Sequence, residues 1–135
     1  MNYLLDSNAV RNLMDEHPRV VERLRQAQPS SSVAVSSIVR GEVLFGIERL
    51  AAGKRRDRLA ATAAAVFARV DEQAVPFSAG DVYARVKRER ERVGLPMDEN
   101  DLWIAATALV LRATLVTRDS DFSNVAGLTV EDWTR

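Results

Sequence analysis

Short apolar runs alternate with longer stretches of mixed polarity along the chain. Tyr3-Leu4-Leu5 and Val33-Ala34-Val35 are runs of this kind, each bounded by polar residues. Runs so short and so apolar are typical of strands that are buried on both faces. On this pattern we predict strands at residues 3–5, 33–35, 74–77, 114–117 and 128–130, with Pro76 placing the third at an end or an edge.

The segments between these runs carry helical signals. Pro18 breaks the first segment, and Ser36 or Ser37 can cap a later helix that Gly53 ends. Asp98 is a plausible N-cap, and the helix after it is apolar almost all round, which predicts that it is buried. The predicted helices cover residues 8–27 with a break at 18, 37–52, 54–70, 79–93 and 99–112.

Strands that alternate with helices predict an α/β fold with a parallel sheet covered on both faces. The chain has 135 residues, which suits one domain over residues 1–135 and not two. Sheets of this class bind their ligands outside the carboxyl ends of the strands. The residues that follow each predicted strand are therefore the first place to look for chemistry.

Composition removes several classes of function. Cysteine is absent and His17 is the single histidine, so thiolate or histidine-rich metal sites and a Ser-His-Asp hydrolase are poorly supported. Nineteen basic residues balance nineteen acidic ones, so any nucleic-acid binding must use a local patch. No apolar run approaches a membrane span, and the start of the chain lacks a signal-peptide pattern. We expect a cytoplasmic protein with no membrane partner.

Acidic residues stand at the points where this fold binds ligands. Asp6 follows the first predicted strand, and Asp119 and Asp121 follow the one at residues 114–117. Glu42 and Asp101 lie in otherwise apolar helical stretches, where an ionised carboxylate is costly unless it is paired or bound to a cation.

Each acid alone also has a structural explanation. Asp6 could cap the next helix, Asp101 could favour a helix dipole, and Asp119 and Asp121 could form an Asx-turn. Glu42 has no such role in the middle of its helix. Two carboxylates about 4 Å apart repel by roughly 4 kcal/mol at an effective dielectric constant near 20, so a cluster of them needs a cation. Oxygen ligands without sulfur indicate Mg²⁺ or Mn²⁺.

The same residues carry a family resemblance. Residues 3–8, 37–46, 101–108 and 115–122, in this order, resemble the motifs of PIN-domain ribonucleases, and in particular VapC-type toxins of toxin–antitoxin systems. The ending at residues 127–133 also fits. The four motifs span nearly the whole chain, and no acid of the family's pattern is missing.

The resemblance implies a PIN-like three-layer sandwich, with a central parallel sheet of about five strands flanked by helices. Asp6, Glu42 and Asp101 match the family's first three metal-binding acids, and Asp119 matches the fourth, with Asp121 as a possible substitute. Supporting roles near the metal would fall to Ser7, Asn8 and Asp98.

The implied activity is Mg²⁺- or Mn²⁺-dependent endonucleolytic cleavage of RNA by water, which leaves 5′-phosphate and 3′-hydroxyl ends. The implied partners are a cognate antitoxin that blocks the cleft and a second copy in a homodimer. Arg11, Arg40 and Arg118 are the sequence neighbours of the acidic motifs, so we expect them to contact RNA.

Two other functions remain open at this point. One is a phosphatase with an aspartate nucleophile, which would need a second aspartate where this chain has Asn8. The other is an RNA- or protein-binding domain that has kept the fold and lost the reaction, against which the intact set of acids argues.

Overall fold

The computed structural model describes residues 2–135 and has at its centre a parallel sheet of five strands. The strand order is β3-β2-β1-β4-β5, and every neighbouring pair is parallel. The predicted α/β class with about five parallel strands is confirmed. The strands are β1 (Asn2–Leu5), β2 (Ser32–Ser36), β3 (Asp71–Gln73), β4 (Thr114–Val116) and β5 (Val130–Glu131).

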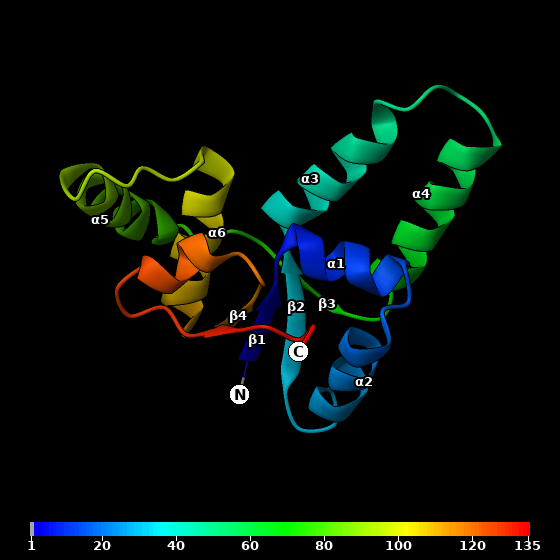
Figure 1. The fold of residues 1–135 in the computed structure, drawn as a ribbon, viewed down its shortest axis with the longest axis horizontal. Helices are drawn as coiled ribbons and strands as arrows, with labels where there is room; N and C mark the ends of the chain where they lie inside the picture. The colour runs from blue at the N-terminus through cyan, green and yellow to red at the C-terminus, as the bar shows by residue number, and fades with distance from the viewer. Residues whose placement is uncertain (1) are drawn as a thin grey trace.

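Helices lie on both sides of the sheet, which makes three layers (Figure 1). Helices α1, α2 and α4 lie on one side of the sheet, and α5 and α6 lie on the other. Helix α3 packs against α4, and this pair projects from the sheet as an arm. The helices are α1 (Ser7–Met14), α2 (Pro18–Ala27), α3 (Ser37–Glu48), α4 (Lys54–Phe67), α5 (Ala79–Arg92) and α6 (Glu99–Leu111), with a 3₁₀ helix η1 (Ser120–Asn124). None of the helices within residues 2–135 combines the length and apolarity needed to cross a membrane.

The core follows from the apolar runs. Leu4, Leu5 and Leu115 on the central strands are fully buried, as the run pattern predicts. Helix α6 packs beside them with Ile104 and Ala105 completely enclosed, which agrees with its nearly continuous apolar sequence. Burial of an aliphatic side chain of this size contributes about 1.5–3 kcal/mol to folding, so these residues hold the strand ends in place.

The predictions for the third strand and for the end of the helix at residues 37–52 were wrong. The third strand is β3 at Asp71–Gln73 and not residues 74–77, where Phe77 is fully exposed. Helix α3 ends at Glu48 rather than near residue 52, so Gly53 precedes α4 and does not end α3. The reason for the strand error is position: β3 is an edge strand that pairs only with β2, so its residues need not be apolar.

The strand order reverses direction between β1 and β4, at the carboxyl edge of the sheet. From β1 the chain moves outward to β2 and β3, and then returns across the sheet to β4 and β5. The carboxyl ends of β1 and β4 therefore lie side by side, with Leu5 in register with Val116 and the Asp6 N–H bonded to the Val116 carbonyl at 3.1 Å. Ligands of open α/β sheets bind at such a reversal of strand order.

Candidate active site: an acidic cavity at the sheet edge

Four carboxylates from separate parts of the chain line one small cavity at this edge. Its volume is about 130 Å³. Asp6 comes from the end of β1, Glu42 from α3, Asp101 from the first turn of α6, and Asp119 from the loop after β4. The other lining residues are Ser7, Asn8, Arg11, Ile104 and Phe122.

Asp6 is both a helix cap and part of the cavity. Its Oδ1 accepts a hydrogen bond of 2.8 Å from the Ala9 N–H at the start of α1, and only 5% of the residue is exposed. Burial raises the pKa of Asp6, and hydrogen bonds from the Thr117 side chain and the Ala9 N–H oppose that rise. Asp6 therefore caps α1 and lines the cavity at the same time, and capping fixes the direction of its carboxylate.

Glu42 is held from two other helices. The Ser7 hydroxyl of α1 donates to Oε1 at 2.5 Å, and the Asn100 amide of α6 donates to Oε2 at 3.3 Å. Both carboxylate oxygens are thereby oriented, although Glu42 itself is only half-buried. Ser7, for which the sequence predicts a supporting role, lines the cavity beside Glu42.

Asp101 has the most strongly perturbed carboxyl group of the site. Its pKa is raised to about 6, first by partial burial and then by the negative charges of Asp98, Asp119, Glu42 and Asp6. The neighbouring carboxylates thus add to the effect of burial and further disfavour the ionised form of Asp101. Such a group favours any cation that can replace the proton.

The geometry separates Asp119 from Asp121. Asp119 lines the cavity, and its Oδ1 accepts a 2.9 Å hydrogen bond from the Asp121 N–H at the start of η1. Asp121 is exposed and does not line the cavity. Asp119 is therefore the better placed of the two to act as the fourth acid.

Of the predicted supporting residues Asn8 and Asp98, one lines the cavity and the other does not. Asn8 lines the cavity and accepts a hydrogen bond of 3.3 Å from Arg11. Asp98 stands at the N-cap position of α6, but its side chain makes no capping hydrogen bond and it is not among the lining residues. Its contribution to the site is the negative charge that it adds beside Asp101.

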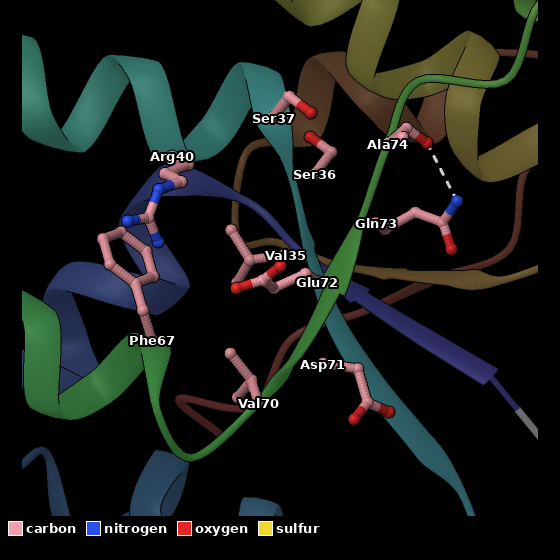
Figure 2. Close-up of a pocket in the computed structure, with 10 residues that line it drawn as sticks. All are labelled: Val35, Ser36, Ser37, Arg40, Phe67, Val70, Asp71, Glu72, Gln73 and Ala74. Atoms are coloured by element: carbon pink, nitrogen blue, oxygen red, sulfur yellow. Dashed lines mark hydrogen bonds between the residues drawn. The ribbon is translucent and has the colours of Figure 1, made fainter.

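Only one of the three predicted RNA-contacting arginines lines the acidic cavity. This is Arg11, which is exposed. Arg40 lies over the ring of Phe67 at 4.7 Å and faces a different pocket beside β2 and β3 (Figure 2). Arg118 lines a neighbouring crevice together with Asp132 and Trp133. Proximity in sequence was a poor guide for Arg40, because the turn of α3 points it away from Glu42.

Comparison with known proteins agrees with this geometry. The family model of the PIN domain matches residues 3–128. The chain belongs to the PIN-domain family. It is 29% identical to Ribonuclease VapC2 of Rickettsia felis over 137 residues, which cover 98% of each chain.

Two solved structures match this PIN domain over nearly its whole length. VapBC2 of Rickettsia felis, bound to a DNA fragment from its promoter, gives a TM-score of 0.89 at 26% identity, covering 97% of this chain and 98% of that chain. VapBC-1 of nontypeable Haemophilus influenzae gives 0.87 at 28% identity, covering 100% of both chains. Within the family, the similarity is to the VapC ribonucleases.

The donor set of this PIN domain fits a hard divalent cation. All four acids offer oxygen, which Mg²⁺ and Mn²⁺ prefer. The carboxylates surround the cavity and do not meet at one point: within residues 2–135, no three acidic or histidine side chains are placed to ligate the same ion. Binding by three of them therefore requires side-chain rotation, and the cation would relieve the repulsion that raises the pKa of Asp101.

Sequence reasoning missed two residues of this PIN-domain site. Thr117 is buried, bonds to Asp6, and accepts the Asp119 N–H on its hydroxyl at 3.0 Å, so it joins two of the four acids. Asn100 orients Glu42 across 58 positions of sequence. The sequence did contain a signal for Thr117, because it is a polar residue at the end of a buried strand. The only signal for Asn100 was its place next to Asp101.

Proposed function

We propose that this chain is a Mg²⁺- or Mn²⁺-dependent endoribonuclease that acts as the toxin of a toxin–antitoxin pair. The observation that carries the proposal is the cavity that four carboxylates from distant segments line beside Arg11. A partly buried acidic cluster destabilises a fold unless a cation balances its charge, and the switch point of the sheet is where a substrate can reach it.

Each side chain has a separate task in this proposal. Asp6, Glu42, Asp101 and Asp119 would hold the ion, while Ser7 and Asn100 keep the Glu42 carboxylate oriented. When bound, the ion acidifies water and neutralises charge on the scissile phosphate. Arg11 is exposed at the rim of the cavity, where its guanidinium can pair with a phosphate of the RNA.

The comparisons support the choice of RNA and of an antitoxin partner. The relative from Rickettsia felis is named a ribonuclease, and the two solved structures described above are VapBC assemblies. We infer that a cognate antitoxin covers the acidic cavity of this chain and inhibits cleavage. The homodimer stays a prediction, which light scattering of the purified chain decides.

A cleavage assay tests the proposal. Purified protein should cut single-stranded RNA with Mg²⁺ or Mn²⁺ and lose this activity in EDTA. Asp101→Asn should reduce cleavage by at least about 100-fold, whereas Asp121→Asn is the matched control from outside the cavity and should retain most of it. Hydrolysis of small phosphate esters without RNA cleavage would instead support the phosphatase. RNA binding without turnover would support the inactive domain.

Expression in cells provides a second test. The parent chain should arrest growth, and Asp6→Ala should relieve the arrest at equal protein level. Co-expression of a short protein encoded beside the gene should also relieve it if that protein is the antitoxin. Equal toxicity of the parent and Asp6→Ala would contradict the nuclease.

A further inference from the structure

A groove runs along α3 away from the acidic cavity. It encloses about 490 Å³ and shares Arg11 and Glu42 with the cavity, so the two are continuous. We call it the α3 groove. Its lining residues are Arg11, Ser37, Ile38, Gly41, Glu42, Phe45, Gly46, Arg49 and Asn100.

Phe45 is the unusual residue of this groove. Its side chain is 66% exposed, although α3 offers buried positions on its other face to Val39 and Val43. Leaving an aromatic ring in water forgoes the stabilisation that burial would give. Because Phe45 lines the groove, its exposed ring is available to a ligand that enters there.

Two glycines of α3 line the groove together with Phe45. Gly41 lies one helical turn before Phe45, and Gly46 follows it directly. A Cβ atom at either position would meet no atom within 4 Å, so neither glycine is required by close packing. Glycine in a helix interior costs about 0.5–1 kcal/mol relative to alanine. What the two glycines do provide is the absence of side chains at two positions that line the groove together with Phe45.

Positive charge borders the same ring. The Arg49 guanidinium lies 6.0 Å from the centre of the Phe45 ring, and Arg11 lies at the end that opens to the acids. Among residues 2–135, neither arginine takes part in an ion pair. Both guanidinium groups are thus available to an anionic ligand that extends out of the cavity.

An aromatic face between two arginines suits a single nucleic-acid strand. Bases stack on aromatic rings and phosphates pair with arginines, and this combination recurs where proteins bind single strands without a fixed sequence. A duplex would keep its base faces hidden. A docked protein segment would need a broader apolar lining than Phe45 and Ile38 supply.

We propose that the α3 groove binds the nucleotide of single-stranded RNA next to the scissile phosphate, with its base stacked on Phe45 and its flanking phosphates on Arg11 and Arg49. The inference rests on the proposed ribonuclease function. It adds a substrate subsite outside the acidic cavity and predicts that single-stranded regions are cut in preference to duplex.

Steady-state cleavage of single-stranded RNA tests the stacking contact. Phe45→Ala should raise KM about tenfold and change kcat less, because stacking holds the strand in both the ground and the transition state. Phe45→Tyr should restore KM, since it keeps the ring. Phe77→Ala is the matched control: Phe77 is fully exposed, lies outside the groove, and should leave KM unchanged.

Blocking the groove without weakening the fold gives a second test. Gly41→Leu would place a side chain against Phe45, where a Cβ meets nothing within 4 Å. Leucine also has a higher helix propensity than glycine. The variant should keep or raise the melting temperature and still cleave RNA at least about fivefold less efficiently in kcat/KM.

Binding can be measured apart from cleavage. In an Asp101→Asn background, Phe45→Trp supplies a fluorescent ring, and an oligoribonucleotide of about 12 residues should quench it at low salt. The same oligonucleotide with an abasic position should quench less. Phe77→Trp is the control and should not respond.

The outcomes separate the two proposals. A parental KM for Phe45→Ala, or no quenching of Phe45→Trp, would overturn the subsite even if the protein is a ribonuclease. Loss of antitoxin binding by Phe45→Ala with unchanged RNA kinetics would overturn it too and assign the groove to the protein partner. Quenching by RNA in a protein that cuts no RNA with either metal would support the subsite and defeat the nuclease.

Discussion

At the scale of single residues, the raised pKa of Asp101 has a consequence for stability. Its pKa is about 6 in the folded chain against 3.8 for an ordinary aspartate, mainly because of burial and the neighbouring negative charges. Between these two pH values the folded chain holds a proton that the unfolded chain releases. The contribution of this group to the free energy of unfolding therefore rises as the pH falls from about 7 towards 4, and ionised Asp101 destabilises the metal-free fold at neutral pH.

We therefore expect Asp101→Asn to raise the melting temperature of the protein in EDTA at about pH 7.5, and to lose about half of this advantage at about pH 5. Thermal unfolding of parent and variant at both pH values measures the difference. Asp121→Asn is the comparison from outside the cavity. An Asp101→Asn advantage of the same size at both pH values would contradict the electrostatic origin.

Arg90 leads to a second prediction at this scale. It lies on α5 and is 94% buried, and its Nη1 donates to the carbonyl of Asn124 at the end of η1 at 3.3 Å. Its Nε has no hydrogen-bond partner among the described residues. No carboxylate lies within ion-pair distance of it in the described residues. Replacing a buried, incompletely paired charge by an apolar group of similar length is often neutral or stabilising. We expect Arg90→Met either to raise the free energy of unfolding or to lower it by less than about 1 kcal/mol. Urea unfolding of parent and variant measures the difference. A decrease of more than about 2 kcal/mol would contradict this expectation.

At the scale of elements, α3 contains a glycine that lowers the stability of the helix and that we attribute to the function of the α3 groove. Gly46 lies in the interior of the helix, and a Cβ there would meet open space. Gly46→Ala should therefore raise the free energy of unfolding by about 0.5–1 kcal/mol, because alanine loses less backbone entropy on folding. Chemical denaturation with unchanged helical circular dichroism checks this. A destabilised variant would mean that Gly46 serves packing.

The strands also show which secondary-structure elements the pattern of apolar residues can predict. Buried strands such as β1 and β4 were found because their own residues must be apolar. The edge strand β3 was misplaced: Asp71 and Glu72 are exposed, and they form a strand because β2 offers them hydrogen bonds. A local pattern cannot report a pairing partner 37 positions away, such as Ala34 for Asp71.

At the scale of the whole molecule, the candidate site was predictable where topology alone decides it. Parallel neighbours must bring Asp6 and Asp119 to one edge, so the spacing of strands and acids was sufficient. The links between the acids were not predictable. Thr117 and Asn100 act through hydrogen bonds whose partners are known only once the helices are packed. The position of Arg40 was not predictable for the same reason, since the direction of its side chain depends on how α3 packs.

The four acids come from separate segments that only the folded chain brings to one cavity, so an ion bound among them should stabilise the fold. At a metal concentration of about 100 times the Kd, binding to the folded state adds about 2.7 kcal/mol to the free energy of unfolding. For a domain of this size, that raises the melting temperature by several °C. We expect Mg²⁺ or Mn²⁺ to raise the melting temperature of the parent and of Asp121→Asn, and to leave Asp101→Asn almost unchanged. Scanning calorimetry across a metal titration, with Ca²⁺ and EDTA alongside, measures this. Equal shifts in all three proteins would mean that the ion binds elsewhere, because Asp101 lines the cavity and Asp121 does not.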